Sequence, residues 1–586
     1  MRAAAQPPLL VLFRTFFGRF FASETVTSDI RLRQTMVWVL AFLLTPGFVL
    51  LIQLFPAYQA IVVRARRFQS PGLVDDWLEW IVFVFVTYSM VTVGLIAAFV
   101  WDALDFDHRD AMVLGPAPVR GRTIVGAKLM ALGALLACAT LPINLVNGFF
   151  FAIETADHIG ARGFAVHFIA FLIATVTAAV FVFAVVVAMR GILSVVAGQH
   201  VAAAAGSFLQ FAFVVGLLSC VFLSPAVWKI PSASLNNPDT VGWFPTSWFL
   251  GLFERVRGST RPYFVPLAAR ALLAVPVATV AAVLVSILSF GRAMQHAISR
   301  PATASWMPAT IWHAAARRLA GGRAVARATC DFTLLTIARN RTVQTPIAMN
   351  AALGVAIALA ALTRAKTVAD LTHPRTIVLW LPLLVGYWIA IGVRAATFMP
   401  SESAAAWVFR AAGVGRGVAF RSGARAATLA VVLPPSLLIV WFGIAPLLGW
   451  RIAAWHTAFV SIVFMAATDA QMLTIRHVPF TEIYAPGHAR LRTRWPLYAI
   501  GMFAVAAWPV RAELRAFGGG EVRLIAAALT VALLIYAAGR RWALPGPPTE
   551  PEEAELVEDD EATVLNIGRV LPARADAIAR AADSHG

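Results

Sequence analysis

The sequence has little charge, almost no lysine and very little cysteine. Only 13% of its 586 residues are charged, about half of what soluble domains carry. Lys128, Lys229 and Lys366 are its only lysines, so arginine supplies nearly all of the net charge of +18. These arginines lie mostly in loops beside apolar stretches, which indicates contact with lipid headgroups rather than with nucleic acid. The cysteines show no spacing typical of a metal site or a disulfide framework; they are Cys138, Cys220 and Cys330.

Apolar residues make up 60% of the chain, and its mean hydropathy is +0.76. A stretch of about 20 apolar residues can cross a membrane as a helix. The sequence therefore predicts an all-α, polytopic integral membrane protein with about twelve spans. We place the spans at 36–55, 80–100, 124–153, 164–189, 201–225, 266–290, 346–363, 376–399, 426–447, 452–474, 495–510 and 524–539.

The twelve spans fall into two groups of six. Residues 1–290 form a first six-span half and residues 343–541 a second one, and 291–342 form a basic cytoplasmic linker with an amphipathic helix. Residues 542–586 are acidic and rich in proline, and we expect a mostly disordered cytoplasmic tail. Because six is even, two halves that arose by duplication would run parallel through the membrane.

The distribution of arginine predicts that both termini are cytoplasmic. The linker 291–342 is the strongest signal, because cations beside spans resist translocation. The loops 56–79 and 226–265 also carry cations and oppose this assignment. We expect a multi-pass protein of a bacterial plasma (inner) membrane.

A charged, helix-breaking element follows the second span of each half. In the first half it holds the acids Asp105, Asp107 and Asp110, a Gly115-Pro116 break, and then the cations Arg120, Arg122 and Lys128. The weaker copy in the second half holds Glu402, Arg410 and Arg416, and Arg425 aligns with Lys128. One such element could be an amphipathic loop that anchors span ends. Two at equivalent places favour a pair of cytoplasmic contact points.

The first of these elements resembles the permease subunits of ABC-2-type exporters. In that family an amphipathic helix precedes the first span, and an acidic loop with a Pro-x-Arg-x-x-Ile stretch and a Gly-x-Lys packs against a separate ATPase. Pro118 to Ile124 and Gly126-Ala127-Lys128 are similar to that pattern. The resemblance implies a permease that exports an unknown substrate, and it makes the charged residues named above for the two elements, except Arg425, candidate contacts to an ABC ATPase subunit.

No ATPase motif is expected on this chain itself. Gly121 to Lys128 reads GRTIVGAK, in which Ala127 separates the glycine and lysine that a P-loop needs in sequence. The sequence also shows no convergent His, Asp and Ser cluster, so we predict a transport component and not an enzyme. The chain would bind no cofactor and no metal, and a partner subunit would use the ATP.

Four polar residues at membrane depth are further candidates: Asn144, Asn147, Asp469 and Gln471. Buried polar groups in a membrane are costly and often functional. Asn144 and Asn147 share one helix face and could equally join helices by hydrogen bonds. Asp469 would serve a proton-coupled secondary transporter of six plus six spans, which is the alternative function. A membrane scaffold that transports nothing is a third possibility.

Overall fold

The computed structural model describes residues 7–21, 29–70, 72–104, 118–155, 160–222, 242–296, 308–363, 376–398, 419–472, 478–481 and 491–518, and a few isolated residues between these ranges. The described residues form helices and contain no strand. The predicted acidic tail 542–586 lies outside the described residues. The chain is an all-α, multi-pass membrane protein, as the sequence predicts.

The first half contains a short helix before the spans, the long helices, and two short helices at their ends. These are α1 (Pro8–Phe21), α2 (Asp29–Arg67), α3 (Gly72–Phe99), α4 (Trp101–Leu104), α6 (Gly121–Thr155), α7 (Gly160–Phe222), α11 (Pro245–Arg257) and α12 (Phe264–His296). Pro142 lies inside α6 without ending it, so the predicted third span is one continuous helix.

The second half begins with a pair of helices before its spans. Its elements are α13 (Pro308–Ala320), α14 (Ala324–Arg339), α15 (Arg341–Leu362), α17 (Thr376–Thr397), α19 (Ala419–Leu438), α20 (Ala445–Leu448), α21 (Trp450–Met472), α22 (Leu491–Met502) and α23 (Trp508–Gly518). Two π-helical segments, η3 (Ile439–Ile444) and η4 (Phe503–Ala507), interrupt the spans. Pro434 and Pro435 lie just before η3, and proline removes the N–H donors that a regular α-helix needs.

Ten helices in the described residues are long and apolar enough to cross a membrane. Each corresponds to one of the twelve predicted spans, and the predicted first span, 36–55, lies within the long helix α2. The predicted fifth span falls on the last part of α7, which includes the apolar stretch Phe208–Cys220, and the twelfth lies outside the described residues.

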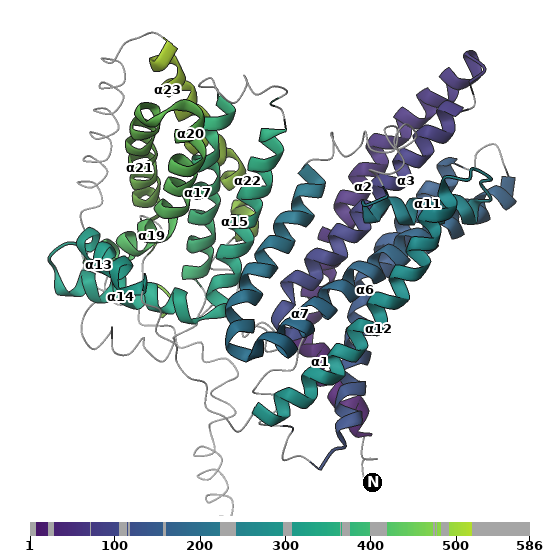
Figure 1. The fold of residues 1–586 in the computed structure, drawn as a ribbon, viewed down its shortest axis with the longest axis horizontal. Helices are drawn as coiled ribbons and strands as arrows, with labels where there is room; N and C mark the ends of the chain where they lie inside the picture. Colours follow the sequence, from purple (N-terminus) through teal and green to yellow (C-terminus); the bar gives the residue numbers. More distant parts are fainter. Residues whose placement is uncertain are drawn as a thin grey trace, which may run out of the picture.

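The helix α7 folds back on itself. Val182 and Leu217 both lie against Gly94 of α3, at 3.0 Å and 2.8 Å from where a Cβ would be. In a straight helix these two residues would be about 52 Å apart. The chain must therefore reverse between them, and Figure 1 shows two arms joined at the lower middle of the molecule. The second arm, Phe208–Cys220, is the predicted fifth span.

One helix is central in each half, and it is the second span of that half. The most apolar stretch of α3 is 78% buried inside the protein, and that of α17 is 83% buried. The glycines of α17 explain part of this burial: a Cβ on Gly392 would lie 2.8 Å from the backbone of Ile347 in α15. Small residues of this kind allow close helix packing in membranes.

The two halves meet along the second arm of α7. Val214 of this arm packs with Ala98 of α3 and Ala352 of α15, and all three are almost completely buried. The Nε2 atom of Gln210 donates a hydrogen bond of 2.8 Å to the Ala98 carbonyl. The fifth span therefore joins the halves.

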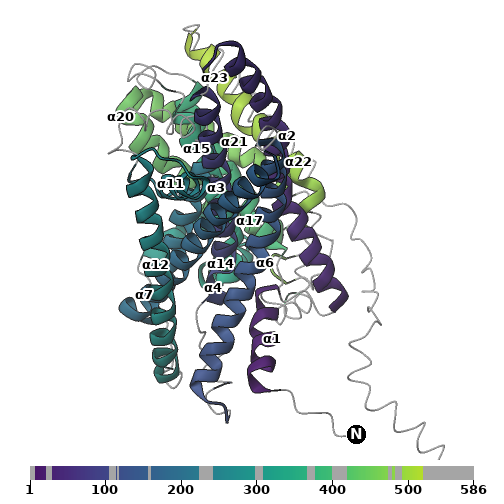
Figure 2. The ribbon, with the colours of Figure 1, turned by 90° about the vertical axis from the view of Figure 1, so that its right-hand side faces the viewer.

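The helices that precede the spans lie toward one side of the molecule. Figure 1 shows α1 low in the first half and α13 and α14 along the lower edge of the second, whereas α11 and α23 lie above. Figure 2, turned by 90°, also places α1 low and α23 high. We call the side with α1, α13 and α14 the lead-helix face, and the other side the opposite face.

Candidate partner-docking face and buried polar sites

The first-half part of the lead-helix face is α1 packed on the start of α6. Phe16 of α1 is buried, with aromatic neighbours on the same helix, and lies against Ile124, Ala127 and Ala131 of α6. The small side chains at 127 and 131 leave room for the rings, which explains why α1 lies so close to α6. The amphipathic helix before the first span is thus fixed to the third span of its half.

Lys128 connects three helices of this half. Its side chain is only 4% exposed. Its Nζ donates a hydrogen bond of 2.6 Å to the Ala103 carbonyl of α4 and lies 5.1 Å from the centre of the Phe16 ring and 5.8 Å from that of Phe20. A cation over aromatic faces is stabilised by the ring quadrupole. Lys128 therefore stabilises the fold here and offers little surface to a partner.

Two other predicted contacts of the first copy lie beside this unit. Arg120 and Arg122 are exposed at the start of α6, where a partner could reach them. Leu114 and Val119 pack against the α1–α6 cluster and so hold the end of the charged loop near the lead helix. Asp105, Asp107 and Asp110 lie outside the described residues.

The second-half part of the face is the α13–α14 pair packed on the start of α19. Its contacts are small: Ala326 and Cys330 of α14 lie against Ala426 and Ala427 of α19. A Cβ on Gly423 would lie 3.0 Å from the Cys330 backbone nitrogen and still closer to the Ala326 carbonyl. Only glycine fits this close approach of two backbones. Burial raises the pKa of the Cys330 thiol to about 11.

Arg425 is the counterpart of Lys128, and it binds a carboxylate. Its guanidinium forms an ion pair with Asp469 near the end of α21, and both side chains are largely buried. Asp469 was predicted as an intramembrane polar candidate, and the structure places it beside a residue of the second charged element. Gln471, two residues later, is half-buried. Glu402, Arg410 and Arg416 lie outside the described residues.

A shared Gly-Ala-cation motif links the two parts of the face. Gly126-Ala127-Lys128 lies in the second turn of α6, and Gly423-Ala424-Arg425 lies in the second turn of α19. Each glycine faces the lead helix of its own half, Leu9 of α1 in one case and Ala326 of α14 in the other. Sequence reasoning aligned the cations but missed Gly423, although the same offset of the numbering aligns both pairs.

The turn between α13 and α14 exposes a basic surface. Arg318, Arg323 and Arg327 are exposed there, and Arg317 holds the two helices together by binding both oxygens of Asp331 at 2.8 Å and 2.9 Å. The hydrogen bond to Asp331 raises the pKa of Arg317. This surface supplies a second charged patch on the lead-helix face.

The two asparagines of α6 have different surroundings. The Nδ2 atom of Asn144 donates to Ser89 Oγ of α3 at 3.0 Å, and that hydroxyl donates to the Thr175 carbonyl of α7. Asn144 therefore joins three helices, which agrees with the interpretation that these asparagines hold helices together by hydrogen bonds. Asn147 is 1% exposed, lies against Gly47 of α2, and has no hydrogen-bond partner among the described residues.

A charged cluster closes the first half on the opposite face. Arg257 at the end of α11 binds Asp75 at 2.9 Å, and Arg261 binds Glu79 at 2.6 Å, so α11 is held to the start of α3. Glu254 is 1% exposed and lies 3.4 Å from Arg257. Burial raises the pKa of the Glu254 carboxyl, and Arg257 offsets part of this. Two cations of the loop 226–265 that opposed the predicted orientation are therefore paired.

The second half has a buried His–Glu pair near the opposite face. Nδ1 of His456 in α21 lies 2.9 Å from an Oε atom of Glu513 in α23. Both side chains are buried, and Nε2 of His456 has no partner among the described residues. The adjacent segment η4 leads directly into α23, and π-helical turns are frequent at functional sites. In the part of the chain that the structure describes, no three His, Cys, Asp or Glu side chains are arranged to hold a metal.

No family model, no curated protein and no solved structure matches this chain. What can be said of its function therefore depends on its own sequence and structure.

Proposed function

We propose that this chain is the membrane permease subunit of an ATP-driven ABC-type exporter. A separate ATPase subunit would dock on the lead-helix face, and the chain itself would form the path for an unidentified substrate. The resemblance of Pro118 to Lys128 to the ABC-2 pattern first suggested this function. The arrangement of the helices now supports it independently of any single motif.

The repeated lead-helix unit is the observation that carries the proposal. In each half a helix before the first span packs on the start of the third span, beside the described residues of the charged element, which are Leu114 and Val119 in the first half and Arg425 in the second. Lipid anchoring alone needs only a cationic surface. Lipid anchoring does not require that a surface helix be fixed to the third span, and still less that this arrangement occur in both halves. Fixed helices are what a motor needs, because a push on them is passed to the spans.

Mechanical transmission would differ between the two copies. In the first half, Lys128 ties α1 and α4 to α6, so a force on α1 or on the charged loop reaches the third span. In the second half, the close contact at Gly423 ties α14 to α19, and Arg425 extends the connection to α21 through Asp469. ATP-driven closure of the partner would then shift the two third spans and reorient the halves.

Charge reversal tests the contact. The permease would be purified with the ABC ATPase encoded beside it, and Asp107→Lys combined with Asp110→Lys should weaken stimulation of ATP hydrolysis about tenfold, because like charges would then face each other. Arg120→Glu combined with Arg122→Glu should act similarly. Arg451→Glu is the matched control, because this arginine is exposed at the start of α21 on the opposite face. Unchanged stimulation in both double variants would contradict the proposal.

The second candidate function is a proton-coupled secondary transporter, and the His456–Glu513 pair is the observation that favours it. Intramembrane ionisable pairs often belong to proton pathways. Asp469, the acid first considered for this role, is instead bound to Arg425. Transport that survives ATP depletion, collapses with the proton gradient and is lost in Glu513→Gln would favour this function over the first.

A further inference from the structure

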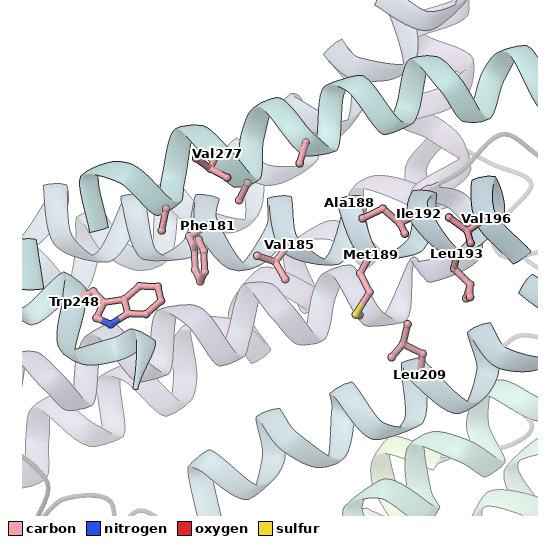
Figure 3. A pocket seen from close by; sticks show the side chains of 13 residues that line it. Phe181, Val185, Ala188, Met189, Ile192, Leu193, Val196, Leu209, Trp248 and Val277 are labelled. Atoms are coloured by element: carbon pink, nitrogen blue, oxygen red, sulfur yellow. The ribbon is translucent and has the colours of Figure 1, made fainter. Parts of the chain in front are cut away.

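A large apolar groove lies between the two arms of α7, α11 and α12. Its volume is about 710 Å³, within the range of roughly 300–1,000 Å³ that small-molecule sites occupy. Figure 3 shows Phe181, Val185 and Met189 along one wall and Leu209 of the second arm across from them. The lining is aliphatic and aromatic, and its one indole nitrogen, in Trp248, already donates to the Gly242 carbonyl at 2.7 Å.

The groove opens on the outside of the helix bundle, where lipid would surround the protein. Val196 at one end is 77% exposed, and Val277 and Ile192 on the rim are about half exposed. The outward side of α12 is apolar as well. From Phe181 to Val196 the groove follows α7 for about 22 Å, longer than the roughly 15 Å half-thickness of a bilayer's hydrocarbon layer. A chain from a single leaflet could lie along its length.

A cation marks one end of the groove. Arg270 precedes Ala274 by one helical turn and lies on the stripe of α12 that continues through Val277, Ala278 and Ala281, all of which line the groove. Its Nη1 donates 2.8 Å to the Gly242 carbonyl, the same oxygen that accepts from Trp248. Its side chain is exposed, and a guanidinium has five N–H donors. The groove is thus apolar along its length and cationic at the α11 end.

We propose that this groove binds one acyl chain of an anionic phospholipid, with the phosphate at Arg270. Because the surrounding lipid is itself apolar, the groove would hold a hydrocarbon chain by van der Waals packing, and arginine is well suited to bind phosphate. The cationic end of the groove lies beside α11, on the opposite face, and no lining residue belongs to α1, α13 or α14, so its occupant does not depend on the ATPase proposed above. A hydrophobic transported compound or a second copy of the chain would be different occupants.

Native mass spectrometry of the full-length protein tests the proposal. The protein would be released from nanodiscs of equal parts phosphatidylglycerol and phosphatidylcholine, and the wild type should retain phosphatidylglycerol. Ala278→Trp fills the groove and should reduce retained lipid about tenfold, since the van der Waals contacts between the acyl chain and the groove would be lost. Val280→Trp, on the exposed side of the same helix, is the control and should retain it. Equal retention in Ala278→Trp and Val280→Trp, or equal loss, would overturn the proposal.

Arg270→Gln tests the headgroup separately from the chain. It should leave total lipid retention similar but reduce the preference for phosphatidylglycerol about fivefold, the effect of one cation beside an anionic lipid. Arg292→Gln, an exposed change at the other end of α12, should leave the preference intact. An unchanged preference in Arg270→Gln would overturn the assignment of the phosphate to this residue.

A third measurement avoids bulky substitutions, so its result does not depend on whether such a variant folds. The fluorescence difference between the wild type and Trp248→Phe isolates one indole at the groove. Phosphatidylglycerol with brominated acyl chains should quench this component more than brominated phosphatidylcholine does. No quenching by either lipid would show that the groove holds no acyl chain, whereas equal quenching by both would overturn the headgroup preference.

Discussion

In the first half, α1 rests on α6 through aromatic rings around a buried lysine, whereas in the second half α14 lies directly against the backbone of α19 at a glycine. Rings and a long cation can adjust to a small displacement, but two backbones in contact cannot. Both lead helices are held to the third spans of their halves, but the first contact can yield to a small displacement and the second cannot. A motor acting on both would produce asymmetric movement.

The largest expected difference between the halves is their response to a methyl group added at the glycine of the Gly-Ala-cation motif. In Gly423→Ala the new Cβ would meet backbone atoms of Ala326 and Cys330 that cannot shift without separating the helices. We expect a loss of about 3 kcal/mol from overpacking. In Gly126→Ala the nearest atom is Leu9 Cδ1 at 3.8 Å, so this variant should be neutral or slightly stabilised. Thermal unfolding in detergent measures both, and equal effects would remove the difference between the halves.

Removing the two cations should have smaller and unequal effects. Arg425→Met leaves the largely buried Asp469 without this guanidinium, and we expect a loss of about 2–3 kcal/mol. Lys128→Met loses the hydrogen bond to the Ala103 carbonyl and the cation–π contacts with α1 but leaves no unpaired charge, so a smaller loss of about 1–2 kcal/mol is expected. Asp469→Asn combined with Arg425→Met should recover part of the stability. If the double variant is no more stable than Arg425→Met, the ion pair is not what stabilises the α19–α21 contact.

The charged cluster of the opposite face allows a pH test. Because burial raises the pKa of Glu254, its carboxyl binds protons more readily in the folded state, and its contribution to stability falls as pH rises through that raised value. Glu254→Gln should therefore be tolerated, and the stability of the wild type should approach that of the variant as the solution becomes mildly acidic. Arg257→Gln should destabilise by about 2 kcal/mol. Melting curves of the wild type and the variants across this pH range test this prediction. If Glu254→Gln loses most stability relative to the wild type in acid, the predicted direction of the pH dependence is wrong.

The smallest expected effect is chemical. In a Cys138→Ala, Cys220→Ala background, Cys330 should react with iodoacetamide only after unfolding, because its thiol is buried and its pKa is about 11. Adding Gly423→Ala should open the α14–α19 contact and make the thiol reactive in the folded protein. Equal labelling in the two proteins would mean that the contact tolerates the extra methyl group.

Hydropathy was enough to predict the fold class and nearly all span positions, because a helix in lipid must be apolar along about 20 residues. It predicted a fifth span where the second arm of α7 lies, but it did not indicate that this arm joins the two halves. That role depends on small residues such as Ala98 and Ala352, which are too common in membrane helices to mark a contact by themselves. The count of twelve spans and the duplication stay predictions.

The candidate residues were predicted by type better than by role. Lys128 was expected at a partner contact, yet it is buried beneath α1, because a long side chain at a helix start can reach inward as easily as outward. Asp469 was considered alone, and its partner Arg425 could not be inferred from a separation along the chain. The groove between α7 and α12 could not be predicted from the sequence, because its lining residues are apolar and are interspersed with apolar core residues of the same helices. Only the folded arrangement brings Arg270 to its end.

Site-specific photo-crosslinking in intact cells tests the docking claim most directly. A photoreactive residue would replace Arg122 at the start of α6 or Arg323 in the α13–α14 turn, and Trp243 or Arg451 on the opposite face as controls, all four of them exposed. The docking proposal predicts crosslinks to the ABC ATPase from positions 122 and 323 and none from 243 or 451. Crosslinks from the opposite face, or from none of the four positions while the two proteins still purify together, would contradict it.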